Sequence, residues 1–315
     1  DPKLDAVSYK KLVEEGEGVW DTRKEILGWI MDGVARTIEL PPKKLDNILA
    51  AIRQARRKRH CTSTAFQSLV GKLTHATLGL PAGRSLMAPL YKLAAKAQEI
   101  PTIQIHPRSE QARALQDLAT LLKTMAQRPT RCAQLVPGPP AYIGNVDACK
   151  HGVGGCWLPA SKPLHPIVWR YKWPQDIATA VDDHTLTIND LEMAGILLHW
   201  LMLEILVPTL VDTHVGIWCD NTSAVAWTRK LSSTRSPAGH ALTRALAMRI
   251  CVTQSSPLTP FHIQGIQNDM ADVPSRSFHA GGPGNHNWTD LEFLTQYNSL
   301  FPLQQEASWP MLQPP

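Results

Sequence analysis

The sequence predicts an α/β fold, a mixed five-stranded sheet with flanking helices, preceded by a mainly helical region. The chain has 315 residues, of which 43% are hydrophobic and 19% charged, enough to bury one or two cores. Apolar residues recur at helical spacing before the proline-rich stretch 137–140, whereas shorter β-branched and aromatic runs follow it. This change predicts a helical region at 1–136, an α/β domain at 137–280 and an irregular tail at 281–315.

Four helices are expected in the first region because its apolar residues recur every three or four positions. They run from Pro41-Pro42 to a basic cluster ending at Arg59, from Thr64 to about Leu78, through Met87, Leu90 and Leu93, and from Ser109 to Met125. Thr64 and Gln67 have the spacing of a capping box and predict where the second helix begins.

Five short runs in the second region predict strands. They are Tyr142–Val146, Val153–Leu158, Ile167–Tyr171, Val215–Cys219 and Leu258–Ile263. Glycines between the first two predict a tight connection and antiparallel pairing. Helices are expected at Asp190 to about Leu206, at Ser223–Lys230 and at Ala238–Cys251. Three strands followed by alternating helices and strands predict a mixed sheet. The Gly/Asn/His-rich tract 281–287 predicts a loop.

Cysteine usage and hydropathy indicate an intracellular protein, in the cytoplasm or nucleus. The six cysteines contain no CxxC pair, which argues against a disulfide scaffold or a zinc finger. The most apolar run, Ile196–Val211, is interrupted by His199, Glu204 and Pro208, so we expect a buried helix and no membrane partner. The chain begins at Asp1 without a signal sequence and is expected to be a piece of a longer protein.

Positive charge is concentrated in one segment. Residues 43–60 carry seven basic residues and one acid, Asp46, while the whole chain has a net charge of +5. The basic residues are Lys43, Lys44, Arg53, Arg56, Arg57, Lys58 and Arg59. Such a concentration favours a polyanionic partner such as nucleic acid. A solvated helix end is the alternative interpretation.

Four carboxylates are expected at the ends of secondary-structure elements. Asp147 ends the first strand, Glu192 lies in the first turn of the following long helix, Asp220 ends the fourth strand, and Asp272 follows the fifth. Acids at the ends of adjacent strands can converge at one sheet edge, where a divalent cation would offset the cost of burying them. Each acid also has a structural alternative: Asp190 and Asp220 suit helix capping, and Asp147 suits the start of a turn.

The motifs around these acids occur in a specific order over about 130 residues. They are Asp147-Ala148-Cys149 followed by Gly152–Gly155, then Ile188–Glu192, Asp220–Val225, and His262–Gly265 with Asn268 and Ala271–Arg276. Together they resemble the ribonuclease H domain of retroelement reverse transcriptases. Cys149 and Pro274 depart from the serine and leucine usual in that family, but neither change removes an acid. The resemblance implies a ribonuclease H-like fold with Asp147, Glu192, Asp220 and Asp272 as metal-binding catalytic acids.

The first half of the chain extends this resemblance. The matching segments are Ile26–Ile30, Ile38–Lys43, Leu69–Leu73 and Leu80–Arg84. They resemble the part of a reverse transcriptase from the primer-gripping turn through the thumb and connection, most like gypsy-type and DIRS-type retroelements. The chain has no Tyr-x-Asp-Asp polymerase motif, since Asp182-Asp183 lies within the second region. The resemblance therefore implies a ribonuclease H without a polymerase active site, with the upstream fingers and palm of the same polyprotein as a partner.

The implied reaction is endonucleolytic hydrolysis of RNA in RNA:DNA hybrids. Two Mg²⁺ ions, with Mn²⁺ as an alternative, would activate water and stabilise the departing 3′ oxygen. A carboxylate site without cysteine or histidine pairs suits Mg²⁺ better than zinc. By the resemblance, Asp147 bridges both ions, Glu192 and Asp220 hold one, and Asp272 holds the other.

Recognition of a hybrid would depend on RNA 2′-hydroxyls and backbone shape. Asn221 is a candidate for such a contact, and a role in starting a helix is its alternative. A further set of basic residues would hold the duplex backbone from the thumb. This set comprises Arg53, Arg56, Arg57, Lys58 and Arg59.

Two other functions remain open from the sequence. One is a catalytically inactive or co-opted nucleic-acid-binding relic of a retroelement polyprotein, which cleavage of a hybrid would distinguish from an enzyme. The other is a transposase or resolvase of the same fold superclass, which the thumb-like first half disfavours. The sequence leaves the oligomeric state, the host and the element open.

Overall fold

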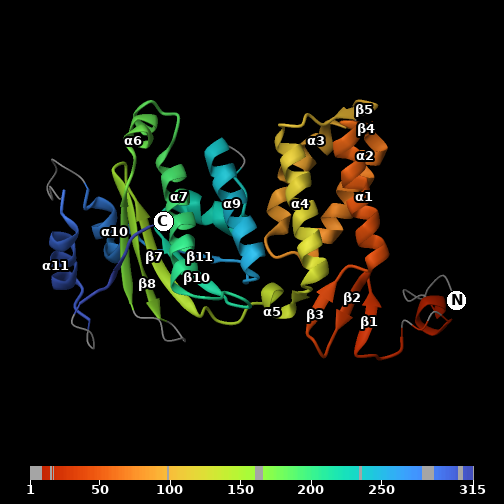
Figure 1. Cartoon of the computed structure of the whole chain (residues 1–315), viewed down its shortest axis with the longest axis horizontal. Helices are drawn as coiled ribbons and strands as arrows, with labels where there is room; N and C mark the ends of the chain where they lie inside the picture. Colours follow the sequence, from red (N-terminus) through yellow and green to blue (C-terminus); the bar gives the residue numbers. More distant parts are fainter. Residues whose placement is uncertain are drawn as a thin grey trace. The chain divides into compact units, whose positions relative to one another are not determined.

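A computed structural model describes residues 9–14, 16, 18–97, 99–159, 166–233, 236–278, 287–303 and 308–314. The chain divides into two compact units. The first comprises Asp1–Leu80 and Leu90–Cys132, and the second comprises Pro81–Pro89 and Ala133–Pro315. The predicted α/β class with a mixed sheet and a mainly helical first part is confirmed (Figure 1).

The first unit packs amphipathic helices beside small antiparallel sheets. Its helices are α1 (Pro42–Lys58), α2 (Ser63–Ala76), α3 (Ala88–Lys96, shared with the second unit) and α4 (Glu110–Gln127), with a 3₁₀ turn at Thr77–Gly79 and a π-helical turn at Lys10–Glu14. The 3₁₀ turn at Gly83–Met87 belongs to the second unit. A four-stranded sheet has the order β1 (Arg23–Ile26), β2 (Trp29–Asp32), β3 (Thr37–Glu39), β6 (Thr130–Arg131), and β4 (His60–Thr62) pairs with β5 (Thr102–Gln104). The four predicted helices are present, but these strands were not predicted.

The predicted capping box of α2 is wrong. Thr62, not Thr64, is the N-cap, and its side-chain oxygen accepts a hydrogen bond from the Ala65 backbone N–H at 3.2 Å. Thr62 has extended backbone angles because it ends strand β4, so the helix begins at the next residue, Ser63. The pairing of β4 with a distant strand, which no local pattern encodes, therefore sets this helix start.

The second unit is built on a six-stranded mixed sheet. Its order is β11 (Thr259–His262), β10 (Val215–Cys219), β7 (Tyr142–Ala148), β8 (Gly152–Pro159), β9 (Ile167–Lys172), β12 (Met311–Leu312). Strand β8 is antiparallel to its neighbours β7 and β9, whereas β10 runs parallel to both β7 and β11. The five predicted strands are all present, and β12 adds a sixth, parallel to β9.

Helices cover both faces of this sheet. They are α6 (Gln175–Asp182), α7 (Ile188–Leu206), α8 (Thr222–Lys230), α9 (Pro237–Thr253), α10 (Asp269–Arg276) and α11 (Asp290–Leu300), with the short α5 (Cys132–Leu135) and a 3₁₀ turn at Gly265–Gln267. Helices α7 and α9 lie on one face, and α10 and α11 lie on the other (Figure 1). The apolar helix α7 is buried in the main core. No helix in the described part of the chain combines the length and hydropathy that a membrane crossing requires.

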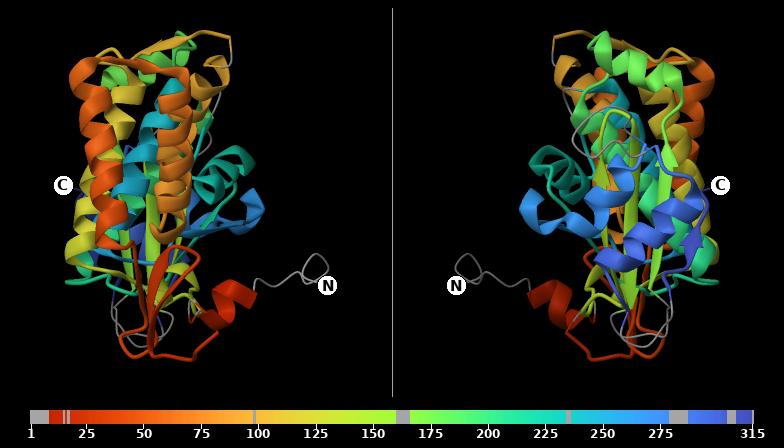
Figure 2. Two further views of the ribbon diagram at one scale, coloured as in Figure 1. Left: turned by 90° about the vertical axis from the view of Figure 1, so that its right-hand side faces the viewer. Right: turned by 90° about the vertical axis from the view of Figure 1, so that its left-hand side faces the viewer.

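The C-terminal segment corrects the expectation of an irregular tail. It contains α11 and β12, and Phe293, Tyr297 and Trp309 are fully or almost fully buried in a second apolar cluster with Cys156 and Val168 of the sheet. Figure 2 (right) shows α11 in front of the sheet. The prediction failed because these aromatic residues are scattered and become a core only against the sheet. In the predicted loop at 281–287, residues 281–286 lie outside the described residues.

A neutral histidine is buried in the main core. The ring of His199 is stacked on Trp157 with centroids 3.9 Å apart, and its Nδ1 accepts a hydrogen bond from Trp169 Nε1 at 2.8 Å. Because Nδ1 is an acceptor, the ring proton is on Nε2. Burial lowers the pKa of His199 well below its ordinary value of 6.5. The folded protein therefore binds this proton less readily than the unfolded chain does.

We expect His199 to destabilise the protein as the pH falls. A depressed histidine pKa gives stability that is complete above the unfolded-state value of 6.5 and is lost below it. The contribution should fall by roughly 1.4 kcal/mol per pH unit below that value. Chemical denaturation of wild type and His199→Gln between pH 5 and 8 measures it. An equally steep acid limb in both proteins would contradict the assignment.

Candidate active site

Asp147 and Asp220 lie at the same edge of the second unit's sheet. Asp147 is the penultimate residue of β7, and Asp220 directly follows the last residue of β10. The two strands are parallel, with Trp218 opposite Asn145, so the register brings Asp220 beside Asp147. The predicted convergence of these two acids is thus present in the structure.

Glu192 joins them from α7. Thr187 is the N-cap of this helix, and Asp190 forms the capping box, accepting hydrogen bonds from the Thr187 N–H at 2.9 Å and hydroxyl at 2.8 Å. The capping alternative for Asp190 is therefore correct, and Glu192 lies in the second turn, not the first. Glu192 is buried, and its ligand atoms lie within 4.8 Å of those of Asp220 and Cys219.

Asp272 comes from a helix that was not predicted, α10, and not from the end of a strand. Helix α10 lies very close to β8: a Cβ added at Gly154 would be only 2.6 Å from Pro274 Cβ. Only a glycine at this position permits such a close approach. Asn268, just before the helix, donates a side-chain hydrogen bond to the Val146 carbonyl at 3.1 Å. This docking orients the helix so that Asp272 approaches Asp147 and Asp220.

Two further residues of α10 contact the acids directly. The Ser275 hydroxyl donates a hydrogen bond to Asp147 Oδ2, and Arg276 Nε pairs with Asp272 Oδ1 at 2.7 Å. Sequence reasoning included both in a family motif but gave neither a role. A serine and an arginine three and four positions after Asp272, one helical turn along α10, are the signal that could have found them.

The four acids are coupled electrostatically. Burial, followed by the charges of Asp147 and Asp220, raises the pKa of Glu192 to about 9. Burial also raises the pKa of Asp147 to about 6; the hydrogen bond from Ser275 opposes this shift, and the charges of Asp272 and Asp220 add to it. For Asp272, burial raises the pKa, Arg276 opposes the shift, and Asp220 adds to it. Burial and, to a smaller extent, mutual repulsion therefore favour protonation unless a cation is present.

The donor atoms fit a hard divalent cation. Cys219 adds a sulfur to the cluster, 3.7 Å from Glu192 Oε2. Burial, followed by the charge of Glu192, raises the pKa of this thiol, so it stays protonated and is a poor metal ligand. The remaining ligand atoms are carboxylate oxygens, which Mg²⁺ and Mn²⁺ prefer.

The predicted basic cluster lies on the C-terminal half of α1. Leu45, Ile48, Ile52 and Ala55 form the buried face of this helix, and the basic side chains are exposed: Arg53, Arg56, Arg57, Lys58 and Arg59. In the described part of the chain no ion pair engages them. The three of them in the last turn also suit the negative end of the helix dipole.

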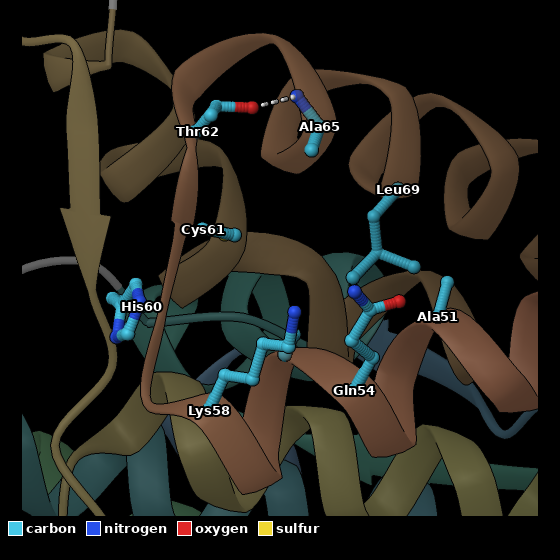
Figure 3. A pocket seen from close by; sticks show the side chains of 9 residues that line it. Ala51, Gln54, Lys58, His60, Cys61, Thr62, Ala65 and Leu69 are labelled. Carbon is cyan, nitrogen blue, oxygen red and sulfur yellow. Dashed lines mark hydrogen bonds between the residues drawn. The ribbon is translucent and has the colours of Figure 1, made fainter.

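A pocket of about 360 Å³ opens beside this cluster, between α1, β4 and α2 (Figure 3). Its lining combines the small apolar residues Ala51 and Ala65 with the polar side chains Gln54, Lys58 and His60. The basic cluster is therefore next to a concave surface.

Asn221 has a structural role. Its side-chain oxygen caps α8 by accepting a hydrogen bond from the Ala224 N–H at 2.9 Å, and its Nδ2 donates to Asn189 Oδ1 at 2.9 Å. The helix-start alternative is thus correct, and the nucleic-acid contact stays a prediction.

The chain is similar in part to solved structures, whereas no family model and no curated protein matches it. A foamy viral protease-reverse transcriptase in complex with double-stranded DNA shares 13% identity, with a TM-score of 0.30, over 78% of this chain and 38% of that chain. Ribonuclease H1 from Halobacterium salinarum shares 12% identity, with a TM-score of 0.29, over 42% of this chain and 91% of that chain. The N-terminal ribonuclease H domain of a Mycobacterium tuberculosis protein shares 13% identity, with a TM-score of 0.29, over 42% of this chain and 88% of that chain. The chain spans 38% of the foamy viral chain's length.

Replacing Glu192 by glutamine should stabilise the metal-free protein. A raised carboxyl pKa gives stability that is present below the ordinary value of 4.5 and is lost as the pH rises through about 9. At pH 8 without divalent cations, Glu192→Gln should unfold at higher denaturant, with a gain on the order of 2 kcal/mol. Mg²⁺ should stabilise wild type more than the variant.

Glu204→Gln is the matched control on the same helix. Glu204 pairs with Arg249, so its replacement should not stabilise the protein. If Glu192→Gln and Glu204→Gln destabilised the protein equally at pH 8, the unfavourable charge assigned to Glu192 in the acidic cluster would be contradicted.

Proposed function

We propose that this chain is the ribonuclease H and thumb-connection part of a retroelement reverse transcriptase of the gypsy or DIRS type. In this proposal it hydrolyses the RNA strand of RNA:DNA hybrids with a divalent metal. The observation that supports it best is the convergence of Asp147, Glu192, Asp220 and Asp272 from four different elements. A cluster of four buried or half-buried acids with one paired cation, Arg276, is costly for a fold, and a bound metal would offset this cost.

The chemistry follows from which side chains can hold a cation. Bound Mg²⁺ would supply an activated water and neutralise charge on the departing 3′ oxygen. Asp147, Glu192, Asp220 and Asp272 would hold it through carboxylate oxygens. The Ser275 hydroxyl fixes the orientation of Asp147, and Arg276 does the same for Asp272. The products would carry 5′ phosphate and 3′ hydroxyl ends.

The partners in this proposal are an RNA:DNA hybrid and the upstream polymerase fingers and palm of the same polyprotein. The exposed basic cluster on α1 supports a contact with the phosphate backbone. This contact would set affinity rather than sequence preference, because phosphates carry no base information.

Asp147→Asn should abolish hybrid cleavage while leaving the fold intact. Asparagine keeps the shape and can still accept the Ser275 hydrogen bond, but it lacks the charge that a metal needs. Cleavage of a labelled hybrid with and without Mg²⁺ measures the effect. Asp269→Asn, an exposed acid on α10, is the matched control and should retain activity. A wild-type protein that binds the hybrid but never cleaves it would favour the relic instead.

Removing the basic cluster should weaken hybrid binding without regard to sequence. If the four residues 56–59 contact phosphates, their replacement by alanine should make the slope of log K against log salt shallower by about three to four. The rate at saturating hybrid should change little.

The control for net charge is the alanine replacement of four exposed basic residues elsewhere in the first unit. These are Lys92, Lys96, Arg108 and Lys123. Equal changes of slope in the two variants would exclude a specific contact by the cluster on α1.

A further inference from the structure

A proline interrupts the hydrogen bonding of the helix that carries Asp272. Pro274 lies inside α10. Proline has no backbone N–H, so the carbonyl of Met270 cannot receive the bond that residue 274 would donate in a regular helix. Asp272 is midway between these two residues. The missing bond therefore loosens the turn that orients this acid, unless another donor replaces it.

Tyr297 of α11 supplies that donor. Its hydroxyl donates a hydrogen bond to the Met270 carbonyl oxygen at 2.9 Å. Tyr297 is fully buried, and its ring contacts Phe301 and Trp309, with centroids 4.8 Å and 5.1 Å away. Burial, the largest cause, raises the pKa of Tyr297 well above its ordinary value, so the hydroxyl stays protonated as a donor. The C-terminal segment thus completes a hydrogen bond that α10 lacks.

A buried arginine fixes α11 in this place. Arg170 of β9 pairs with Asp290, the first residue of α11, at 2.7 Å. The same guanidinium donates to Ser277 Oγ at 2.9 Å, just beyond the end of α10, and its Cζ lies 4.5 Å from the ring centroid of Phe293. One side chain of the sheet therefore connects the end of α10 to the start of α11.

We propose that Tyr297 is a positioning residue for the acidic cluster, which holds the Asp272 turn of α10 by replacing the backbone donor that Pro274 lacks. This inference rests on the proposed function for its effect on metal binding. Its effect on α10 itself does not depend on that function. The Tyr297 hydroxyl bonds to the Met270 carbonyl because Pro274 has no N–H to do so. Restoring a backbone N–H at position 274 should therefore make the hydroxyl unnecessary.

A double-mutant cycle on the full chain tests this directly. The variants are Tyr297→Phe, Pro274→Ala and the two combined. Phenylalanine removes only the hydroxyl, and alanine restores the N–H while keeping the Cβ that packs on Gly154. Two quantities are measured: hydrogen exchange of the α10 amides, and Mn²⁺ affinity by calorimetry.

Tyr297→Phe should speed exchange in α10 and weaken Mn²⁺ binding, each by about tenfold, the scale of one lost buried hydrogen bond. In the Pro274→Ala background the same change should cost less than about twofold. Asn298→Ala is the matched control, since Asn298 bonds within the C-terminal segment, to Trp309 N and the Leu294 carbonyl. Its effect should be the same in both backgrounds.

The proposal is overturned if Tyr297→Phe leaves α10 exchange unchanged, or if Pro274→Ala does not reduce its effect. Wild type that binds no Mn²⁺ would refute the proposed function instead, and the exchange data would still decide whether Tyr297 holds α10. Normal Mn²⁺ affinity together with faster α10 exchange in Tyr297→Phe would also overturn the proposal, because the hydroxyl would then stabilise the helix without positioning Asp272.

Discussion

The burial of carboxyls close to one another is the constraint on which this edge of the second unit's sheet depends. Burial is the largest cause of the raised pKa of Asp147, Glu192 and Asp272, and the neighbouring negative charges add to it. The hydrogen bond from Ser275 and the ion pair with Arg276 offset part of this cost, both from α10. The remainder favours either a proton or a cation. Without a cation, the raised pKa values favour protons on these carboxyls, and a cation bound at this sheet edge would replace them.

Holding these carboxyls close together requires rigid surroundings. Contacts with several parts of the second unit hold α10 in place. Gly154 of β8 lets the helix approach the sheet, since a Cβ there would be 2.9 Å from the Ser275 nitrogen. Asn268 bonds to the Val146 carbonyl at the start of α10, and Arg170 bonds to Ser277 at its end. These contacts hold an eight-residue helix, too short to be stable alone, in a fixed orientation. The orientation of Asp272 is thus a property of the whole unit.

The sequence predicted the parts of the fold that depend on local pattern. The five main strands and helix α7 follow from hydrophobic periodicity, and Asp147, Asp220 and Glu192 follow from their places next to these elements. Helix α10 was missed because it is short and contains Pro274. The start of α2 was misplaced because the pairing of β4 with β5 fixes it. Helix α11 and strand β12 were missed because Tyr297 and Trp309 become a core only against the sheet. Tertiary contacts decide each of these features.

Pro274 connects these successes and failures. In the sequence it is a departure from a family pattern that removes no acid, so it carries no evident consequence. In the structure Pro274, two residues after Asp272, lacks the N–H that would bond to the Met270 carbonyl in a regular helix. The hydroxyl of Tyr297, 23 positions further along the chain, donates a hydrogen bond to that carbonyl instead. A proline inside a helix violates a local preference, and here it identifies the place where a distant side chain supplies the hydrogen bond that the helix lacks. The aromatic C-terminal segment is therefore part of the architecture of the candidate site.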